Sequence, residues 1–85
     1  MNRFIVISPD TDRVHVAVEN NFSERHYQIM PGVWAVASEG KTPSEVCEVL
    51  GISGKHGNTG MVFSLGAYYG FYDPILWEKL NNWGE

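Results

Sequence analysis

Two short segments of this chain, RFIVIS near its start and VWAVA near its middle, are apolar on both of their alternating faces. In the first, Phe4 and Val6 lie on one face of the predicted strand, and Ile5 and Ile7 lie on the other. A strand with two apolar faces is typically central in its sheet and covered on both sides. These two segments therefore predict the two central strands of a sheet.

The second segment, Val33–Ala37, places Trp34 and Val36 on one face and smaller apolar residues on the other. It follows another predicted strand, Arg25–Ile29, after the tight Met-Pro-Gly turn at residues 30–32. Two strands joined by so short a turn pair as a hairpin.

Helix starts are marked by capping residues at two places. Thr42, with proline next and Glu45 three residues later, predicts a capping box, and Gly51 ends that helix. Asp73 precedes a proline and begins a second helix, which Gly84 ends. Both starts use a proline where the missing N–H would be unpaired in any case.

Two further segments complete the chain. Met61–Leu65 is a short apolar run between glycines, which favours a strand. Arg13–Phe22 is ambiguous: its valines alternate as in a strand, whereas Val14, Ala17 and Val18 also follow helical spacing. Local propensity slightly favours the strand, because β-branched side chains lose rotamer freedom in a helix.

Element order resolves this ambiguity. With a helix at residues 13–22, the chain reads βαββαβ plus a C-terminal helix, the split βαβ arrangement with sheet order 4-1-3-2. The first and third strands are then central, and these are the two segments with two apolar faces. We therefore expect an α+β fold, a ferredoxin-like sandwich with an added C-terminal helix, formed by residues 1–85 as one domain.

In this arrangement both crossover helices cover one face of the sheet, so the opposite face needs a cover of its own. The C-terminal helix, only about 15 Å long, would cover part of it, and a second copy or another protein would cover the rest. The residues assigned to this open face, and so to protein binding, are Phe4, Val6, Trp34 and Val36.

Aromatic residues cluster just before the last helix, in the sequence AYYGFY. They either seal one end of a small core or form a recognition surface, a role that suits tyrosine because it buries a large area with few rotatable bonds. The residues of this second candidate binding set are Tyr68, Tyr69, Phe71 and Tyr72.

Composition excludes several classes of protein. The net charge is −4, and the six Lys and Arg residues are scattered, so no cluster for binding a nucleic-acid backbone is expected. One cysteine makes no internal disulfide, and neither a signal peptide nor a membrane span is expected. We expect a cytoplasmic protein, with a mobile glycine-rich loop at Ser53–Thr59.

Candidate chemical sites are sparse. Asp10 and Asp12 lie in one turn and could share a Mg²⁺ ion with their counterparts in a symmetric partner, or serve as a turn residue and a helix cap. Cys47 is expected to be a buried, inert thiol. The histidines, which lack metal-ligand spacing, are His15, His26 and His56.

Four segments, RFIVISPD, PGVWAVAS, TPSEVCEVLGI and GMVFSLGAYYGFYDPILWEKL, together resemble the small ferredoxin-like proteins of the Cas2-like and SinR-like type. The resemblance implies a helix at Arg13–Phe22 and a homodimer formed through sheet edges or faces. Cas2 proteins carry an acidic residue after the first strand, proposed to bind a metal at the dimer axis, and Asp10 matches that position. The resemblance also points to a phage or mobile-element context.

These observations lead to two main functional hypotheses, beside a third in which the chain is a purely structural subunit with no binding partner of its own. The first is a non-catalytic, homodimeric protein-interaction module without a cofactor, acting as an inhibitor or accessory factor in a phage, mobile-element or defence setting. The alternative is a Cas2-like, Mg²⁺-dependent nuclease that uses Asp10 at a dimer axis.

Overall fold

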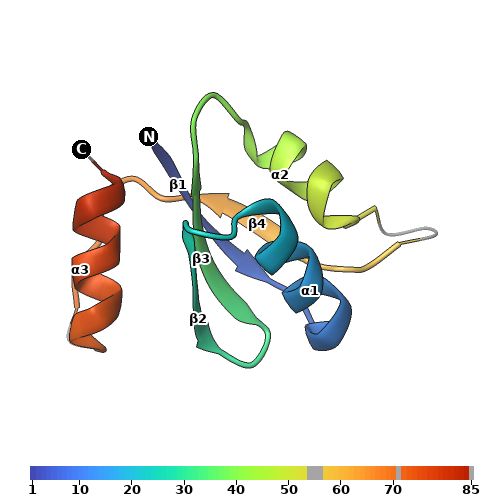
Figure 1. The fold of residues 1–85 in the computed structure, drawn as a ribbon, viewed down its shortest axis with the longest axis horizontal. Coiled ribbons are helices and arrows are strands. Elements are labelled where there is room, and N and C mark those ends of the chain that lie inside the picture. Colours follow the sequence, from blue (N-terminus) through green and yellow to red (C-terminus); the bar gives the residue numbers. More distant parts are fainter. Residues whose placement is uncertain (54–56, 71, 85) are drawn as a thin grey trace.

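The computed structural model describes residues 1–53, 57–70 and 72–84 of the chain. Its helices and strands follow one another in the predicted order (Figure 1). Their bounds are β1 Asn2–Ile7, α1 Thr11–Asn21, β2 His26–Met30, β3 Val33–Ser38, α2 Pro43–Leu50, β4 Met61–Ser64 and α3 Pro74–Trp83.

The strands form one antiparallel sheet in the order β2-β3-β1-β4. The two segments with two apolar faces, β1 and β3, are its central strands, as the sequence predicts. They pair with Phe4 opposite Val36 and Val6 opposite Trp34. The α+β class and the predicted 4-1-3-2 strand order are therefore confirmed.

The ambiguous segment is the helix α1, which buries Val14 and Val18 completely. The burial of these two side chains on one stripe outweighs the weak strand propensity of the valines. Asp10 occupies the N-cap position but makes no capping bond with its side chain, and Asp12 lies in the first turn. The expectation that Asp12 caps this helix is therefore wrong.

The other predicted helix starts are confirmed. At α2 the Thr42 side chain accepts a bond from the Glu45 N–H, and the Glu45 carboxylate accepts one from the Thr42 N–H. At α3 the Asp73 Oδ1 accepts from the Ile75 N–H at 2.9 Å. Gly84 ends α3 as expected: it is the C-cap residue that follows Trp83, and it has right-handed helical angles.

Helices α1 and α2 cover one face of the sheet, here called the inner face (Figure 1). Four large side chains of the central strands point into this core, and each is at most 1% exposed. They are Phe4, Val6, Trp34 and Val36. The expectation that these residues line the open face is wrong, because both faces of the two strands are apolar and the pattern alone does not show which face receives the helices.

Helix α3 lies on the opposite face, here called the outer face (Figure 1). Its Leu80 and Trp83 side chains are buried against Ala35 and Ala37 of β3. The small alanine side chains let the helix lie close to the sheet. The sheet is thus the middle of three layers, with two helices on one side and one on the other.

Part of the predicted Ser53–Thr59 loop, including His56, lies outside the described residues. Its described ends are held together by an isolated bridge between Ile52 and Asn58. Across residues 1–53, 57–70 and 72–84, no helix has the length and apolar character needed to cross a bilayer.

Candidate functional site

The outer face carries an exposed apolar strip made of Ile7, Met61 and Phe63. Met61 pairs with Ile7 across β1 and β4, and Phe63 pairs with Ile5, so their side chains share the face of the sheet on which α3 lies. Ile7 is 44% exposed, Met61 60% and Phe63 45%. This apolar strip is a part of the sheet that the described helices leave open.

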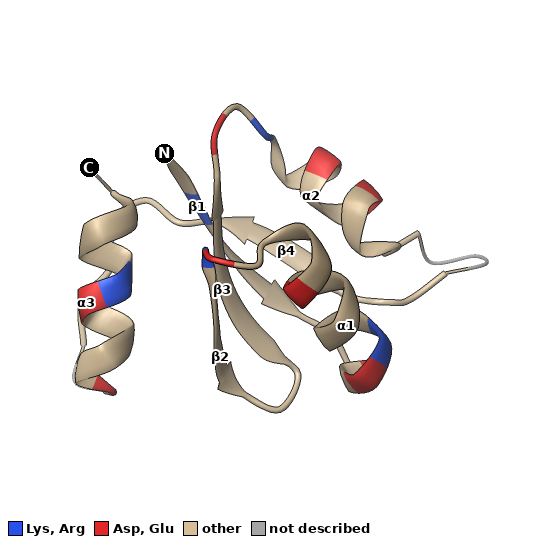
Figure 2. Ribbon diagram, in the orientation of Figure 1, with Lys and Arg blue, Asp and Glu red and all other residues tan. Residues whose placement is uncertain are grey.

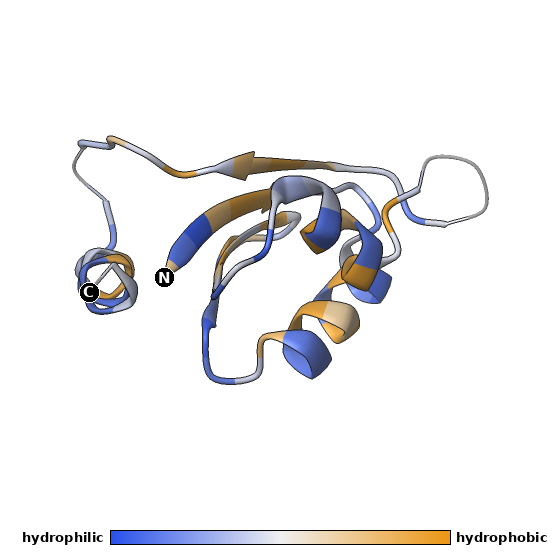
Figure 3. Cartoon of the chain, turned by 90° about the horizontal axis from the view of Figure 1, so that it is seen from above, coloured by the Kyte–Doolittle hydropathy of each residue, from blue (hydrophilic) through white to orange (hydrophobic). Residues whose placement is uncertain are grey.

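The strip is open because α3 is short and lies to one side. A ten-residue helix is about 15 Å long and covers only part of a four-stranded sheet. The chain leaves β4, runs past the edge of the sheet and returns into α3 at some distance from β4 (Figure 3). Among the described residues, no helix therefore covers the β4 side chains on this face.

A cavity of about 190 Å³ lies beside the apolar strip, between the sheet and α3. Ile5 and Leu80 contribute aliphatic surface to its lining, and Tyr68, Tyr69 and Trp77 contribute aromatic rings. Such a mainly apolar hollow accepts a hydrophobic side chain or ligand group.

The tyrosines predicted as a recognition surface have different roles. Tyr68 is fixed: its ring lies 5.3 Å from that of Trp77, and its hydroxyl accepts a bond from Arg3 Nη1 at 3.1 Å. Tyr69 is 85% exposed and meets Trp77 edge-on at 6.3 Å. Tyr68 thus helps to close the outer layer, whereas Tyr69 extends into solvent.

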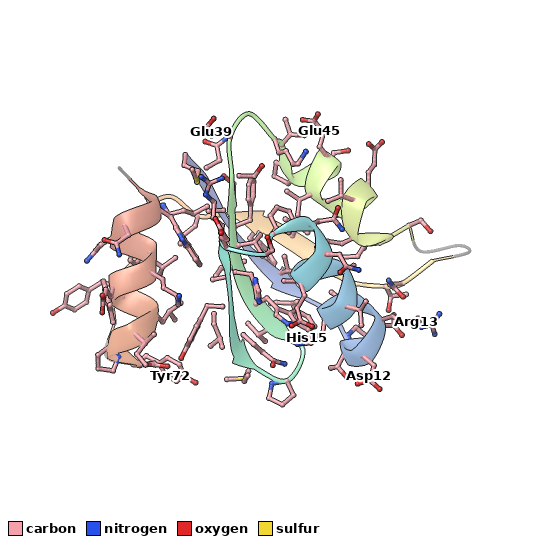
Figure 4. The ribbon with its side chains drawn as sticks, viewed as in Figure 1. Asp12, Arg13, His15, Glu39, Glu45 and Tyr72 are labelled. Atoms are coloured by element: carbon pink, nitrogen blue, oxygen red, sulfur yellow. The ribbon has the colours of Figure 1, made fainter. Side chains whose placement is uncertain are left out.

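Tyr72 lies near the start of α3, beside β2 (Figure 4). Its hydroxyl donates to the Ile29 carbonyl at 3.2 Å, although the side chain stays 55% exposed. The remaining member of the predicted set, Phe71, lies outside the described residues.

Sequence reasoning missed the role of Arg3. Its Nη1 also donates to the Leu80 carbonyl at 3.0 Å, and its guanidinium lies 5.4 Å from the centre of the Tyr68 ring. Arg3 therefore joins β1 to the last turn of α3. The available signal was its position: it alternates with Ile5 and Ile7 and so lies on the outer face.

Asp10 fastens the turn after β1 to the segment before β4. Its Oδ2 accepts bonds from the Thr59 backbone N–H at 2.7 Å and from the Thr59 hydroxyl at 3.1 Å. These bonds, the backbone bond first, lower the pKa of the Asp10 carboxyl. Ser8 strengthens the same junction, because its hydroxyl donates to the Thr59 carbonyl at 2.5 Å.

Asp10 and Asp12 both line a hollow in the turn after β1, where Asp10 Oδ2 accepts the two bonds from Thr59. In the described part of the chain, no three His, Cys, Asp or Glu side chains are grouped as a metal site would require.

The described histidines and the cysteine have structural partners. His15 lies on α1 (Figure 4), where its Nδ1 accepts a bond from the buried Trp34 indole N–H at 3.1 Å and its Nε2 lies 3.3 Å from a Glu19 carboxylate oxygen. His26 Nδ1 lies 2.7 Å from the Phe22 carbonyl. Cys47 is half-buried, and burial raises the pKa of its thiol.

A second polar link connects β2 to the start of α3. The Tyr27 hydroxyl donates to Asp73 Oδ2, which raises the pKa of Tyr27 and lowers that of Asp73. Together with Arg3 at the other end of α3, this link fixes the helix over β1, β2 and β3 and away from β4.

Comparison with protein families, curated proteins and solved structures finds no match to this chain.

Proposed function

We propose that the protein is a non-catalytic, cytoplasmic interaction module with a ferredoxin-like βαββαβ fold and an added C-terminal helix. It acts as a homodimer and binds a further protein, as an inhibitor or accessory factor in a phage, mobile-element or defence setting. The observation that carries this proposal is the apolar strip of Ile7, Met61 and Phe63 beside an aromatic-walled cavity.

The proposal follows from the exposure of the apolar strip to water. Contiguous apolar surface is costly to expose and commonly marks a place where another macromolecule docks. Tyr69 adds a large, stiff aromatic side chain next to the cavity, and residues of this type contribute strongly to protein interfaces. The strip favours self-association, and the cavity beside it offers a socket for one apolar side chain of a partner.

The test is to place a charge on the apolar strip and measure self-association by sedimentation equilibrium at micromolar concentrations. Met61→Glu is expected to shift the protein from dimer to monomer, because a carboxylate at an apolar interface loses its water. Val16→Glu is the matched control: Val16 is also an exposed apolar residue, 55% exposed, but it lies on α1 on the other side of the sheet.

The proposal is supported if wild type and Val16→Glu dimerise equally and Met61→Glu does not. It is overturned if wild type is a monomer at all concentrations, or if Met61→Glu dimerises as well as wild type does.

The Cas2-like nuclease hypothesis requires Asp10 to bind Mg²⁺ at a dimer axis. In the structure its Oδ2 accepts two hydrogen bonds from Thr59. Mg²⁺-dependent cleavage of DNA or RNA that disappears in Asp10→Asn, but persists in Thr59→Val, would replace our proposal.

A further inference from the structure

The two edge strands of the sheet, β2 and β4, differ in how well their outward backbone groups are protected from pairing with another strand. On β2 the register shifts between Gln28 and Met30, and the Tyr72 hydroxyl donates a hydrogen bond to the Ile29 carbonyl. On β4 the register with β1 is regular over the whole strand. Among the described residues no strand lies beyond β4, and Figure 3 shows it at the outer margin of the sheet.

The open edge of β4 presents backbone groups at defined positions. The Leu65 N–H donates to the Arg3 carbonyl at 2.8 Å, so this residue faces β1 with its backbone. In an antiparallel ladder every second residue of a strand points its backbone N–H and C=O groups to the same neighbouring strand. Phe63 and Met61 therefore also bond to β1, and the N–H and C=O groups of Val62 and Ser64 point to the open edge.

This edge is free of charge. No Asp, Glu, Lys or Arg occurs between Lys55 and Asp73, and Figure 2 shows no charged residue on β4. Natural edge strands are commonly protected by a charge, a proline or a bulge, and β4 has none of the three. In a chain with a net charge of −4, a charge-free edge is where a second copy meets the least repulsion.

We propose that β4 pairs antiparallel with β4 of a second copy, about a two-fold axis that passes beside Val62. The ladder joins the open backbone groups of the two Val62 residues and sets Met61 of each copy opposite Phe63 of the other. Both side chains then lie on the outer face, where they cover each other. This inference rests on the proposed function, because it names the partner of the apolar strip as a second copy.

The expected interface is small. Three large side chains at about half exposure supply roughly 300 Å² per copy, and strand pairing adds backbone area. A standard stable interface takes about 800 Å² per partner. The dimer is therefore expected to exchange with monomers in the micromolar range.

The register is tested with single cysteines in a Cys47→Ser background under mild oxidant. Residues directly opposite in a non-hydrogen-bonded pair have Cα atoms about 4.5 Å apart, within reach of a disulfide. We expect a mixture of Met61→Cys and Phe63→Cys to give a cross-linked dimer, and neither variant alone to do so, because like residues lie about 8 Å or more apart.

Two results would overturn this register. One is efficient cross-linking of either single variant with itself. The other is no cross-link in the mixture although wild type sediments as a dimer that Met61→Glu dissociates. In the second case the proposed function stands and the β4 pairing fails, so the two proposals are distinguishable.

A second variant tests the backbone bonds directly. In the proposed ladder Ser64 lies opposite residue 60 of the other copy, and Ser64→Pro removes the Ser64 N–H that points to the open edge while it leaves the bonds to β1 intact. It is expected to weaken dimerisation at least tenfold with an unchanged circular dichroism spectrum, whereas Ser64→Ala dimerises as wild type does. A folded Ser64→Pro variant with wild-type affinity would refute the edge pairing.

Discussion

At the scale of single residues, polar side chains position the elements and the apolar cores fill the space between them. Asp10 holds the segment before β4, Arg3 holds the end of α3, and the Tyr27–Asp73 pair holds its start. None of these contacts follows from local sequence, because each joins residues more than forty positions apart. Sequence analysis recognised Asp10 and Asp73 as turn or cap residues and missed their distant partners.

The Asp10 link makes a prediction about pH. Because the bonds from Thr59 lower the folded pKa below the unfolded value, the link stabilises the fold at neutral pH and loses its effect as pH falls through the folded pKa. Asp10→Asn should therefore be less stable than wild type at pH 7, and the difference should shrink below about pH 4. Urea unfolding across this range measures it.

Glu39→Gln is the control for this experiment, since Glu39 lies exposed in the loop after β3 (Figure 4). If the difference in free energy of unfolding between wild type and Asp10→Asn stayed constant from pH 7 to pH 2, the stabilising role of the ionised Asp10 carboxylate would be contradicted.

At the scale of elements, capping signals predicted α2 and α3 and apolar patterns predicted the four strands, with small shifts at the ends, whereas α1 was predicted only from the order of the elements. What sequence could not show was which face of the sheet received α1 and α2. Phe4 and Trp34 lie on the inner face, and Ile5 and Ala35 lie on the outer one, but all four are apolar. The distinction depends on volume: two helices leave room for large side chains, whereas α3 packs closely over alanines.

The α2 capping box allows an element-scale prediction. Thr42→Ala removes the side chain that accepts from the Glu45 N–H and should lower the free energy of unfolding by about 1 kcal/mol. Ser44→Ala, at an exposed site two residues later, should change the free energy of unfolding by a few tenths of a kcal/mol at most. Equal losses in the two variants would show that the cap contributes little.

At the scale of the whole molecule, the two sides of the sheet are unequally closed. The inner core is complete within one chain, whereas the outer layer leaves the apolar strip in water. The candidate site could not be located from sequence for this reason: an exposed Met61 and a partly buried Val62 are neighbours in the same apolar run, and only the fold shows which of their two faces lies under α1 and α2.

If a second copy covers the strip, thermal stability depends on concentration. The second copy binds only the folded state and so raises the midpoint of thermal unfolding, Tm. For a chain of this size, a tenfold increase in protein concentration above the dissociation constant should raise Tm by about 3–5 °C. Calorimetry at several concentrations measures this. Met61→Glu should show a Tm that does not depend on concentration.

The burial of Trp34 has a consequence for observing the protein. Its indole lies fully enclosed between the sheet and α1, stacked 6.3 Å from the His15 ring, whereas Trp77 and Trp83 both belong to α3. Each side of the sheet therefore carries its own intrinsic fluorophore. Emission from a Trp34-only variant reports on the inner core, and emission from a variant without Trp34 reports on α3, so the detachment of that helix can be followed as an optical event separate from global unfolding.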